Sequence, residues 1–262
     1  MFERYWQTIG TDKNLLVYSR VPWDSQYLGN TTVEIKEFTF TTNQEAKRLL
    51  LTLIKQLKLT KGDLLFFKTS PLQIASIQTL TTLGFYPVEE AVEIAFDLSG
   101  WIPNALPQHK VQGYRLVSAT KKHLPFIKKI VGRAFTLDRY HIDKNIPARG
   151  ANNRYIGWVE TSMKGADEVF AYIDANNVVA GFFIIAKNLG CINLRLAAID
   201  PSLVGKGLGK LLYFSMLALL QKRGDTSIQT QISVNNTPVW NVYTYLVHPK
   251  VTRVEMVLHN IL

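Results

Sequence analysis

Glycine and lysine alternate in the segment 203–210, LVGKGLGK, which follows a strand-like run and precedes a long apolar run. Glycine leaves room for a ligand to approach the backbone, and free N–H groups at the start of a helix attract anions. Lys206 and Lys210 add positive charge. The segment therefore predicts a phosphate-binding turn, with a tight turn that binds nothing as the plainer alternative.

Two common phosphate loops do not fit these letters. The loop that binds nucleotide phosphates and magnesium needs a hydroxyl residue after its lysine, and Leu211 follows Lys210. The dinucleotide-binding fingerprint needs a third glycine at the place that Lys210 occupies. The turn must therefore hold a phosphate in another setting, or none.

The chain of 262 residues is 47% hydrophobic and carries a net charge of +10. Such a charge favours anionic partners, either nucleic acid or a polyphosphorylated small molecule. The lysines and arginines are scattered and form no basic tail, so we expect an anionic small molecule and no nucleic acid.

Several features of the sequence limit where the protein is located and whether it contains disulfides or a metal site. The apolar run 211–220 is far shorter than the about 20 residues of a membrane span, and the first residues lack a signal peptide's apolar core. Cys191 is the only cysteine, which excludes an internal disulfide and a cysteine-rich metal site. We expect a cytoplasmic protein with no membrane partner and no metal.

The periodicity predicts two domains, 1–105 and 111–262, separated by the proline-containing segment 98–110. In the first, strands 32–40, 63–69 and 91–98 alternate with helices 43–59, with Asn43 as N-cap, and 71–85. In the second, the predicted order is strand 114–119, helix 121–135, a polar loop leading into a helix, strands 168–174, 177–187 and 191–200, helix 209–223, strand 227–234, helix 238–247 and strand 251–259. Both parts are α/β.

The phrase AAIDPSLVGKGLGKLL and this element order resemble the GNAT superfamily of N-acetyltransferases. Gly207 and Gly209 match its motif Q/R-x-x-G-x-G/A, whereas Val204 replaces the usual Gln or Arg. The resemblance implies a mixed, mostly antiparallel sheet flanked by helices, and acetyl-CoA as co-substrate. The residues it implies for coenzyme A are Ala198, Ile199, Val204, Gly205, Lys206, Gly207, Leu208, Gly209, Lys210 and Asn236.

A second superfamily motif, N-x-x-A-x-x-L-Y, resembles the segment from Asn236 to Tyr243. The resemblance implies that Tyr243 is the general acid that protonates the leaving thiolate, because a phenol with a pKa of about 10 is protonated at neutral pH. A core aromatic is the structural alternative for Tyr243, and an N-cap is the alternative for Asn236. Val247 and His248 replace the Gly-Phe pair that often follows this motif.

Longer stretches resemble the TDP-fucosamine acetyltransferases, namely the phrases at 21–29, 135–165 and 230–236. That family acetylates a nucleotide-linked amino sugar, and its smaller N-terminal α/β domain is degenerate. The phrase ending in Leu83-Gly84-Phe85 echoes a GNAT helix and suggests a degenerate half-copy here. The resemblance implies acceptor binding by Arg139, His141, Asp143 and Trp158.

Each acceptor residue also has a structural alternative: a salt bridge for Arg139, loop hydrogen bonds for His141 and Asp143, and core packing for Trp158. The general base is open between His141, Asp143, Glu160 and a water chain. Other functions are open too: acetylation of another small amine or amino acid, or coenzyme A binding without catalysis. A homodimer is one oligomeric state that the sequence leaves open.

Overall fold

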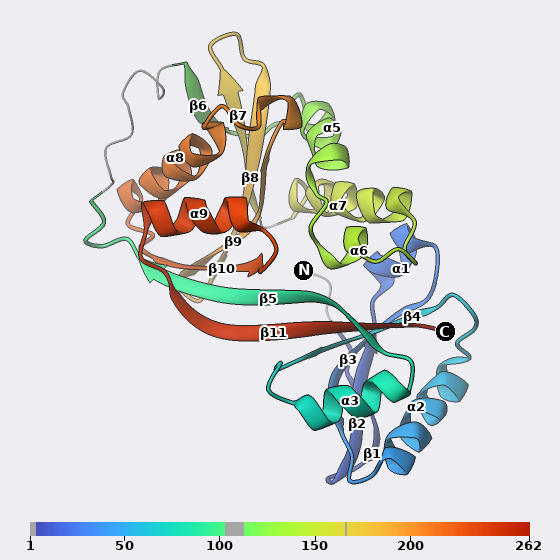
Figure 1. Ribbon diagram of the computed structural model, residues 1–262. Helices are drawn as coiled ribbons and strands as arrows, with labels where there is room; N and C mark the ends of the chain where they lie inside the picture. Colours follow the sequence, from blue (N-terminus) through green and yellow to red (C-terminus); the bar gives the residue numbers. More distant parts are fainter. Residues whose placement is uncertain (1–3, 103–112, 166) are drawn as a thin grey trace. The chain divides into compact units, whose positions relative to one another are not determined.

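The computed structural model describes residues 4–102, 113–165 and 167–262, which belong to two compact units (Figure 1). Unit 1 comprises Met1–Ala91, Asp138–Arg154 and Val254–Leu262, and unit 2 comprises Val92–Leu137 and Tyr155–Arg253. The domain boundary predicted at 105–111 lies outside the described residues and stays a prediction.

Unit 1 contains a sheet in the order β1-β2-β3-β4-β11. The β3–β4 pair is parallel, whereas the β1–β2, β2–β3 and β4–β11 pairs are antiparallel. The elements are β1 (Gln7–Thr11), β2 (Asn14–Arg20), α1 (Pro22–Leu28), β3 (Thr32–Thr39), α2 (Asn43–Leu57), β4 (Leu64–Thr69), α3 (Ile74–Thr82), the first part of β5 (Tyr86–Asp97), α6 (Arg139–Ile142), the first part of α7 (Ala148–Ser162) and the last part of β11 (Lys250–Ile261).

The two faces of the unit 1 sheet differ in chemistry, because side chains alternate along a strand. One face carries Leu65, Phe67 and Leu258 into an apolar core with α2. Helix α2 contributes Ala46, Leu49, Leu50 and Leu53, the spacing of an amphipathic helix. The opposite face carries Glu34, Phe66, Lys68, Glu255 and His259, and most of these polar groups are buried. Buried polar groups of this kind need partners or a function.

The predicted N-cap of α2 is wrong by one residue. The helix begins at Asn43, and the preceding Thr42 has an extended backbone and accepts a hydrogen bond from the Glu45 N–H. Threonine and asparagine can both cap a helix, so residue type alone does not decide between neighbours.

Unit 2 contains a sheet in the order β5-β10-β9-β8-β7-β6. The β9–β10 pair is parallel, and the β6–β7, β7–β8 and β8–β9 pairs are antiparallel. Together with the helices on this sheet, the pairing confirms the predicted mixed, mostly antiparallel α/β fold. The elements are β6 (Tyr114–Ser118), α5 (Leu124–Ala134), β7 (Glu168–Asp174), β8 (Val179–Asn188), β9 (Cys191–Ile199), the 3-10 helix η1 (Pro201–Leu203), α8 (Leu208–Lys222), β10 (Ser227–Ser233) and α9 (Thr237–Leu246), with the remaining parts of β5, α7 and β11.

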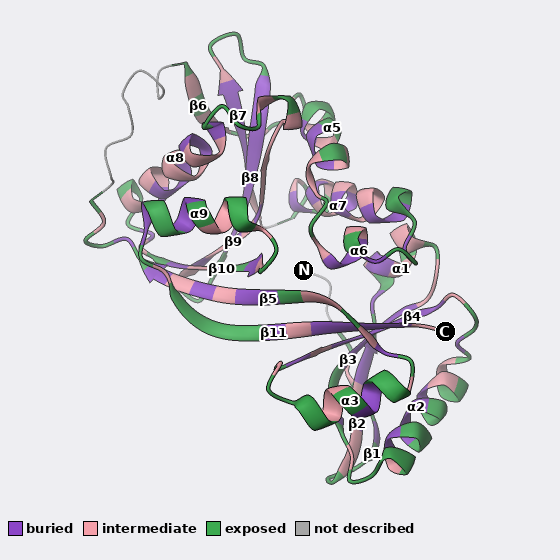
Figure 2. Cartoon of the chain, viewed as in Figure 1, coloured by how far each residue is buried: buried purple, intermediate pink, exposed green. Residues whose placement is uncertain are grey.

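The core of unit 2 lies between its sheet and the helices α8 and α9. The first eight residues of β8 are all buried, as its purple colour in Figure 2 shows. Helix α8 contributes Leu208, Leu211, Leu212, Met216, Leu217 and Leu220 to the same core. The helix that follows the glycine turn is therefore anchored along its whole length, which fixes the position of its N-terminus.

The same order of elements occurs twice. The series β3-α2-β4-α3-β5 corresponds to β9-α8-β10-α9-β11, and the first two strands of each series are parallel neighbours. The last strands are exchanged: β11 pairs with β4, and β5 lies beside β10. The predicted degenerate half-copy in the N-terminal part stays a prediction.

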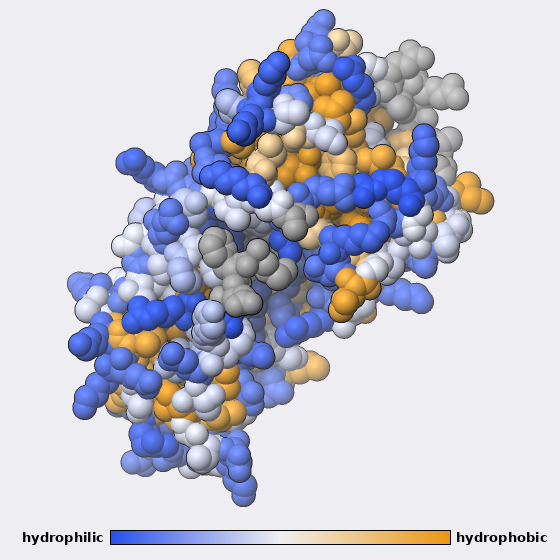
Figure 3. Space-filling view, turned by 180° about the vertical axis from the view of Figure 1, so that it is seen from behind, coloured by the Kyte–Doolittle hydropathy of each residue, from blue (hydrophilic) through white to orange (hydrophobic). Residues whose placement is uncertain are grey.

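Hydrophilic side chains cover much of the face shown in Figure 3, with smaller hydrophobic patches between them. Among the described residues, no helix combines the length and the apolar character that a membrane crossing requires.

Candidate functional site

The glycine turn lies between the end of β9 and the start of α8, as predicted from the sequence. Gly205 and Gly207 have positive φ angles of 84° and 79°, which most other residues adopt only at a cost. Gly207 is the N-cap residue of α8 and has no side chain to satisfy the first N–H groups. The helix therefore begins with uncapped donors, which an anion can accept.

Gly209 is a glycine that the backbone does not require. It lies inside α8 with an ordinary φ angle, and a Cβ built there meets no atom within 4 Å. Glycine costs about 1 kcal/mol relative to alanine inside a helix. Neither packing nor backbone geometry explains its presence, whereas close approach of a ligand does.

The side chains of the turn differ in burial. Leu208 is buried in the core, whereas Val204 and Lys206 are exposed. Lys210 is half-buried, and its Nζ lies 4.0 Å from the centroid of the Tyr245 ring on α9. Because Val204 points to solvent, its departure from Gln or Arg leaves the backbone donors of the turn unchanged.

Ala198 and Ile199 lie on a part of β9 that is paired on one side. They pair with Phe182 and Gly181 of β8. On the other side, the described residues of β9 and β10 are paired at 192–194 and 228–230, and this register extends no further. The later residues of β9 thus keep backbone groups that can pair with an extended ligand.

Asn236 and Tyr243 both lie on or next to α9. Asn236 is its N-cap, and its Oδ1 accepts a hydrogen bond from the Val239 N–H at 3.3 Å. Tyr243 is 2% exposed, and its ring lies 5.2 Å from that of Tyr213 and 5.8 Å from that of Phe96. Burial raises the pKa of Tyr243 well above its usual value, so the phenol keeps its proton. The structure thus shows the core packing of Tyr243 and the N-cap role of Asn236. Neither prevents a second role, in catalysis for Tyr243 or in coenzyme A binding for Asn236.

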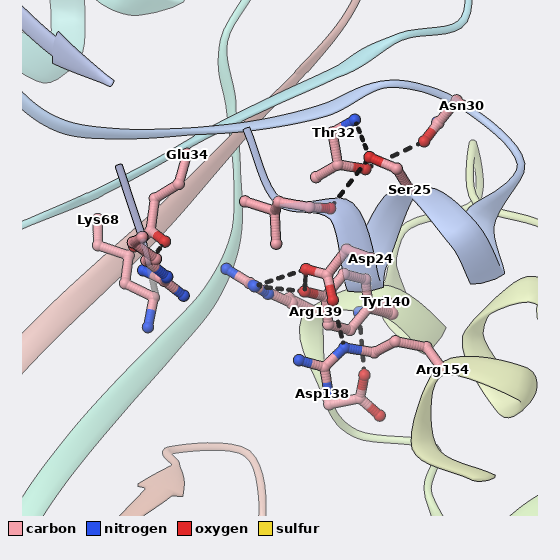
Figure 4. Close-up of polar contacts among 12 residues, drawn as sticks. Asp24, Ser25, Asn30, Thr32, Glu34, Lys68, Asp138, Arg139, Tyr140 and Arg154 are labelled. Atoms are coloured by element: carbon pink, nitrogen blue, oxygen red, sulfur yellow. Dashed lines mark hydrogen bonds and ion pairs between the residues drawn. The ribbon is translucent and has the colours of Figure 1, made fainter. Parts of the chain in front are cut away.

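Arg139 lies in unit 1, within a buried cluster of charges (Figure 4). Asp24 of α1 is 1% exposed and accepts hydrogen bonds from Arg154 Nε at 2.9 Å and from the Tyr140 hydroxyl at 2.6 Å. Arg139 Nη2 lies 3.9 Å from Asp24 Oδ2 and donates to the Tyr140 hydroxyl. Burial opposes the charge of Asp24, but Arg154 and Arg139 hold its pKa below the usual value. The salt bridge anticipated for Arg139 is thus formed.

Asp143 belongs to a second buried group in unit 1. It accepts hydrogen bonds from His259 Nδ1 at 2.8 Å and from the Tyr86 hydroxyl at 2.9 Å. Burial would raise the pKa of Asp143, but these bonds and the Asn145 N–H lower it. Burial lowers the pKa of His259, which is 0% exposed. Asp143 therefore orients an uncharged imidazole.

His141 is held by two oxygen atoms. Its Nδ1 faces Asp138 Oδ2, and its Nε2 lies 2.9 Å from Asn152 Oδ1. Burial would lower the pKa of His141, but these two bonds and the charge of Asp138 raise it. An imidazolium can donate to both oxygens, so the protonated form is the one that this arrangement stabilises.

We expect His141 to stabilise the protein more at acid than at alkaline pH. Because its folded pKa is raised, the contribution is complete below the unfolded value of about 6.5 and is lost as the pH rises through the folded pKa. Urea unfolding of the wild type and of His141→Gln at about pH 5.5 and about pH 8.5 measures this. The exposed His248→Gln is the control. If the wild type and His141→Gln differed equally in free energy of unfolding at both pH values, the expectation would be contradicted.

Trp158 and Glu160 lie in the part of α7 that belongs to unit 2. Trp158 is half-buried and its ring lies 6.1 Å from that of Tyr155. Glu160 forms an ion pair with Lys128 of α5. The aromatic packing of Trp158 agrees with its structural alternative, whereas the ion pair gives Glu160 a structural role beside its candidacy as general base.

Sequence reasoning missed two contributors to the buried cluster of unit 1. Lys68 on β4 and His259 on β11 are far apart in the sequence, and neither belongs to a motif that carries the family resemblance. The strand register places His259 opposite Phe66, with Lys68 two residues further along the same face. A polar residue at an alternate position of an apolar strand was the signal available in each case.

Comparison with known proteins identifies a family for part of the chain. Residues 136–246 match the acetyltransferase (GNAT) family. The range includes the glycine turn, Asn236 and Tyr243. A search of curated proteins finds no match for this chain.

Solved structures share the fold at low sequence identity. A GCN5-related N-acetyltransferase from Sphaerobacter thermophilus is 10% identical with a TM-score of 0.63, over 96% of this chain and 82% of that one. A tandem GNAT protein of the clavulanic acid biosynthesis pathway is 13% identical with a TM-score of 0.55, over 97% and 80%. A glucosamine N-acetyltransferase region of a fungal enzyme is 10% identical with a TM-score of 0.65, over 94% and 31%.

Residues 136–246 are thus similar to the acetyltransferase (GNAT) family, and the solved structures show that this chain shares their fold. The finer resemblance to the TDP-fucosamine acetyltransferases is not confirmed by these comparisons.

Proposed function

We propose that the protein is an acetyl-CoA-dependent N-acetyltransferase in which a neutral amine attacks the thioester carbonyl directly. A C–N bond forms, the C–S bond breaks, the amine loses a proton to a base and the leaving thiolate takes one from an acid. The observation that carries the proposal is the uncapped, unobstructed glycine turn at the start of α8. Its backbone donors suit a pyrophosphate.

The strand before the turn complements it. The backbone of Ala198 and Ile199 on β9 has an unpaired side in the register, suited to the amide groups of a pantetheine arm. Lys206 and Lys210 would add attraction for phosphates, and Asn236 would stand at the start of the neighbouring helix. Bound in this way, acetyl-CoA supplies the activated acyl group.

For the acceptor we propose a nucleotide-linked amino sugar, with Arg139 as a partner for its phosphates and His141, Asp143 and Trp158 as further contacts. The net charge of +10 favours an anionic small molecule over nucleic acid or a membrane. The fold neighbour that acts on glucosamine indicates that this fold is compatible with an amino sugar. We place the reaction in the cytoplasm, where the free thiol of Cys191 stays reduced.

A panel of amines assayed for thiol release from acetyl-CoA tests this function. TDP- and UDP-linked amino sugars should be acetylated faster than amino acids or polyamines. Turnover on another amine alone would overturn the acceptor and keep the enzyme class. Coenzyme A binding without turnover on any amine would favour the non-catalytic alternative.

Replacing Tyr243 by phenylalanine should lower kcat by roughly a hundredfold, because proton transfer by a positioned acid contributes on that order. The KM for acetyl-CoA should stay near the wild-type value, since the phenol acts on the leaving sulfur. Steady-state kinetics of the purified variant measures both constants.

Tyr213→Phe is the matched control, because Tyr213 is a tyrosine of the same core whose ring lies edge-on to Tyr243. It should keep wild-type kcat. A Tyr243→Phe enzyme with wild-type kcat would remove Tyr243 from the mechanism and leave it as a core residue.

A further inference from the structure

Against the polar face of the unit 1 sheet lies a donor that no described residue uses. Arg139 Nη1 is buried and has no hydrogen-bond partner among the described residues. Its other terminal nitrogen, Nη2, is bound to the Tyr140 hydroxyl and lies near Asp24. Such an orphaned donor on a buried cation is costly, and proteins keep few of them without a functional reason.

Lys68 is a second cation of this face, and its ion pair with Glu255 is a long one. Its nearest carboxylate oxygen in an ion pair is Glu255 Oε2, at 4.0 Å. Burial and the charge of Arg139 lower the pKa of Lys68, and Arg139 is its strongest charged influence. Two cations therefore repel each other across a partly buried space. An anion between them would relieve this repulsion.

The strand register explains how the two cations come together. Phe66 and Lys68 point to the same face of β4. The guanidinium carbon of Arg139 lies 4.1 Å from the centroid of the Phe66 ring, so Arg139 covers the position next to Lys68 on this face. Figure 4 shows the guanidinium of Arg139 directed away from α1, toward the side on which Lys68 and Glu34 are drawn.

A second unsatisfied atom lies against the same ring. His259 Nε2 is buried without a partner among the described residues, and the His259 ring centroid is 6.4 Å from that of Phe66. Asp24 is engaged by Arg154, Glu34 by Arg4 and Asp143 by His259, while Glu255 forms the long ion pair with Lys68. Because the uncharged His259 donates through Nδ1 to Asp143, its Nε2 is an acceptor, and the unused donor that lies against Phe66 is Arg139 Nη1.

We propose that Arg139 Nη1 and Lys68 Nζ bind an oxyanion, a carboxylate or a phosphate group, as the anionic end of the acceptor. Assigning the anion to the acceptor rests on the proposed function, whereas oxyanion binding itself does not. Arginine suits planar, bidentate contacts with either group, and lysine adds a compact charge. The N-terminal half then contributes a residue, Lys68, to the binding of this anion.

The test is binding of inorganic phosphate and of acetate to the full chain without acetyl-CoA, at constant ionic strength set with chloride. Isothermal titration and the rise of the Tm with anion concentration give the two readouts. At least one of the two anions should bind the wild type, and the stronger one identifies a phosphate or a carboxylate as the ligand group. If neither anion binds, the proposal is wrong.

Lys68→Met should weaken this binding at least about tenfold, since one of two charged contacts is lost. Its Tm without anion should change little, because losing the repulsion from Arg139 offsets losing the long ion pair with Glu255. Lys55→Met is the control, since Lys55 is exposed on α2 against the other face of the sheet. Arg139→Gln should also lose binding. Unchanged affinity in Lys68→Met would overturn the assignment, and thiol release with acetyl-CoA, measured separately, would still report on the enzyme class.

Discussion

Asp24→Ala is expected to lower the free energy of unfolding by about 3–5 kcal/mol, the range for breaking a buried ion pair on one side. Asp24 is 1% exposed, and it holds Arg154, Arg139 and the Tyr140 hydroxyl. Without it the buried guanidinium of Arg139 and the half-buried one of Arg154 lose their common partner. Urea unfolding at neutral pH measures the loss.

Two variants sharpen this experiment. Asp12→Ala removes a carboxylate from the exposed turn between β1 and β2 and should change stability by less than about 0.5 kcal/mol. Asp24→Asn keeps the shape of the side chain but not its charge, so its loss in free energy of unfolding should lie between those of Asp12→Ala and Asp24→Ala. A variant Asp24→Ala as stable as the wild type would mean that the cluster contributes no net stability.

Gly209→Val is expected to raise the KM for acetyl-CoA at least about tenfold while leaving the free protein as stable as before. The Cβ at this position meets no protein atom, and valine costs less than glycine in a helix. The branched side chain would instead occupy the space that we assign to the pyrophosphate. Steady-state kinetics and thermal unfolding without ligand separate the two effects.

Gly132→Val is the matched control, because Gly132 is also a helical glycine with open space at its Cβ, on α5. It should change neither the KM nor the Tm by much. If Gly209→Val kept a wild-type KM, the turn would not be the site of coenzyme A.

The glycine turn was predictable because everything it needs is local. Positive φ angles, an uncapped helix start and a lysine pair all lie within eight residues, 203–210. The long helices and the strands of unit 2 were likewise visible in their periodicity. The β1–β2 hairpin and α1 were not proposed, since their short polar and aromatic phrases have no clear period.

The buried polar face of unit 1 could not be predicted from the sequence. Asp24, Lys68, Arg139 and His259 come from four separate segments, and only strand register and tertiary packing bring them together. The resemblance pointed to Arg139 and to the phrase around Asp24, but not to their mutual contact. The sequence alone does not tell whether an isolated lysine or histidine in an apolar strand is exposed to solvent or buried beside another polar group.

The exchange of last strands has a consequence for how the chain matures during synthesis. Thr69 of β4 pairs with Met256 of β11, so the first ninety or so residues leave the ribosome with one side of β4 uncovered. An open strand edge is a template for pairing with other chains. The chain between β4 and β11 is a long loop, but each doubling of loop length adds only about 0.6 kcal/mol to the free-energy cost of closing it. The time before β4 and β11 can pair is therefore set by translation more than by loop entropy. During that interval the nascent N-terminal half depends on chaperones or on its own charged side chains to stay apart from its neighbours.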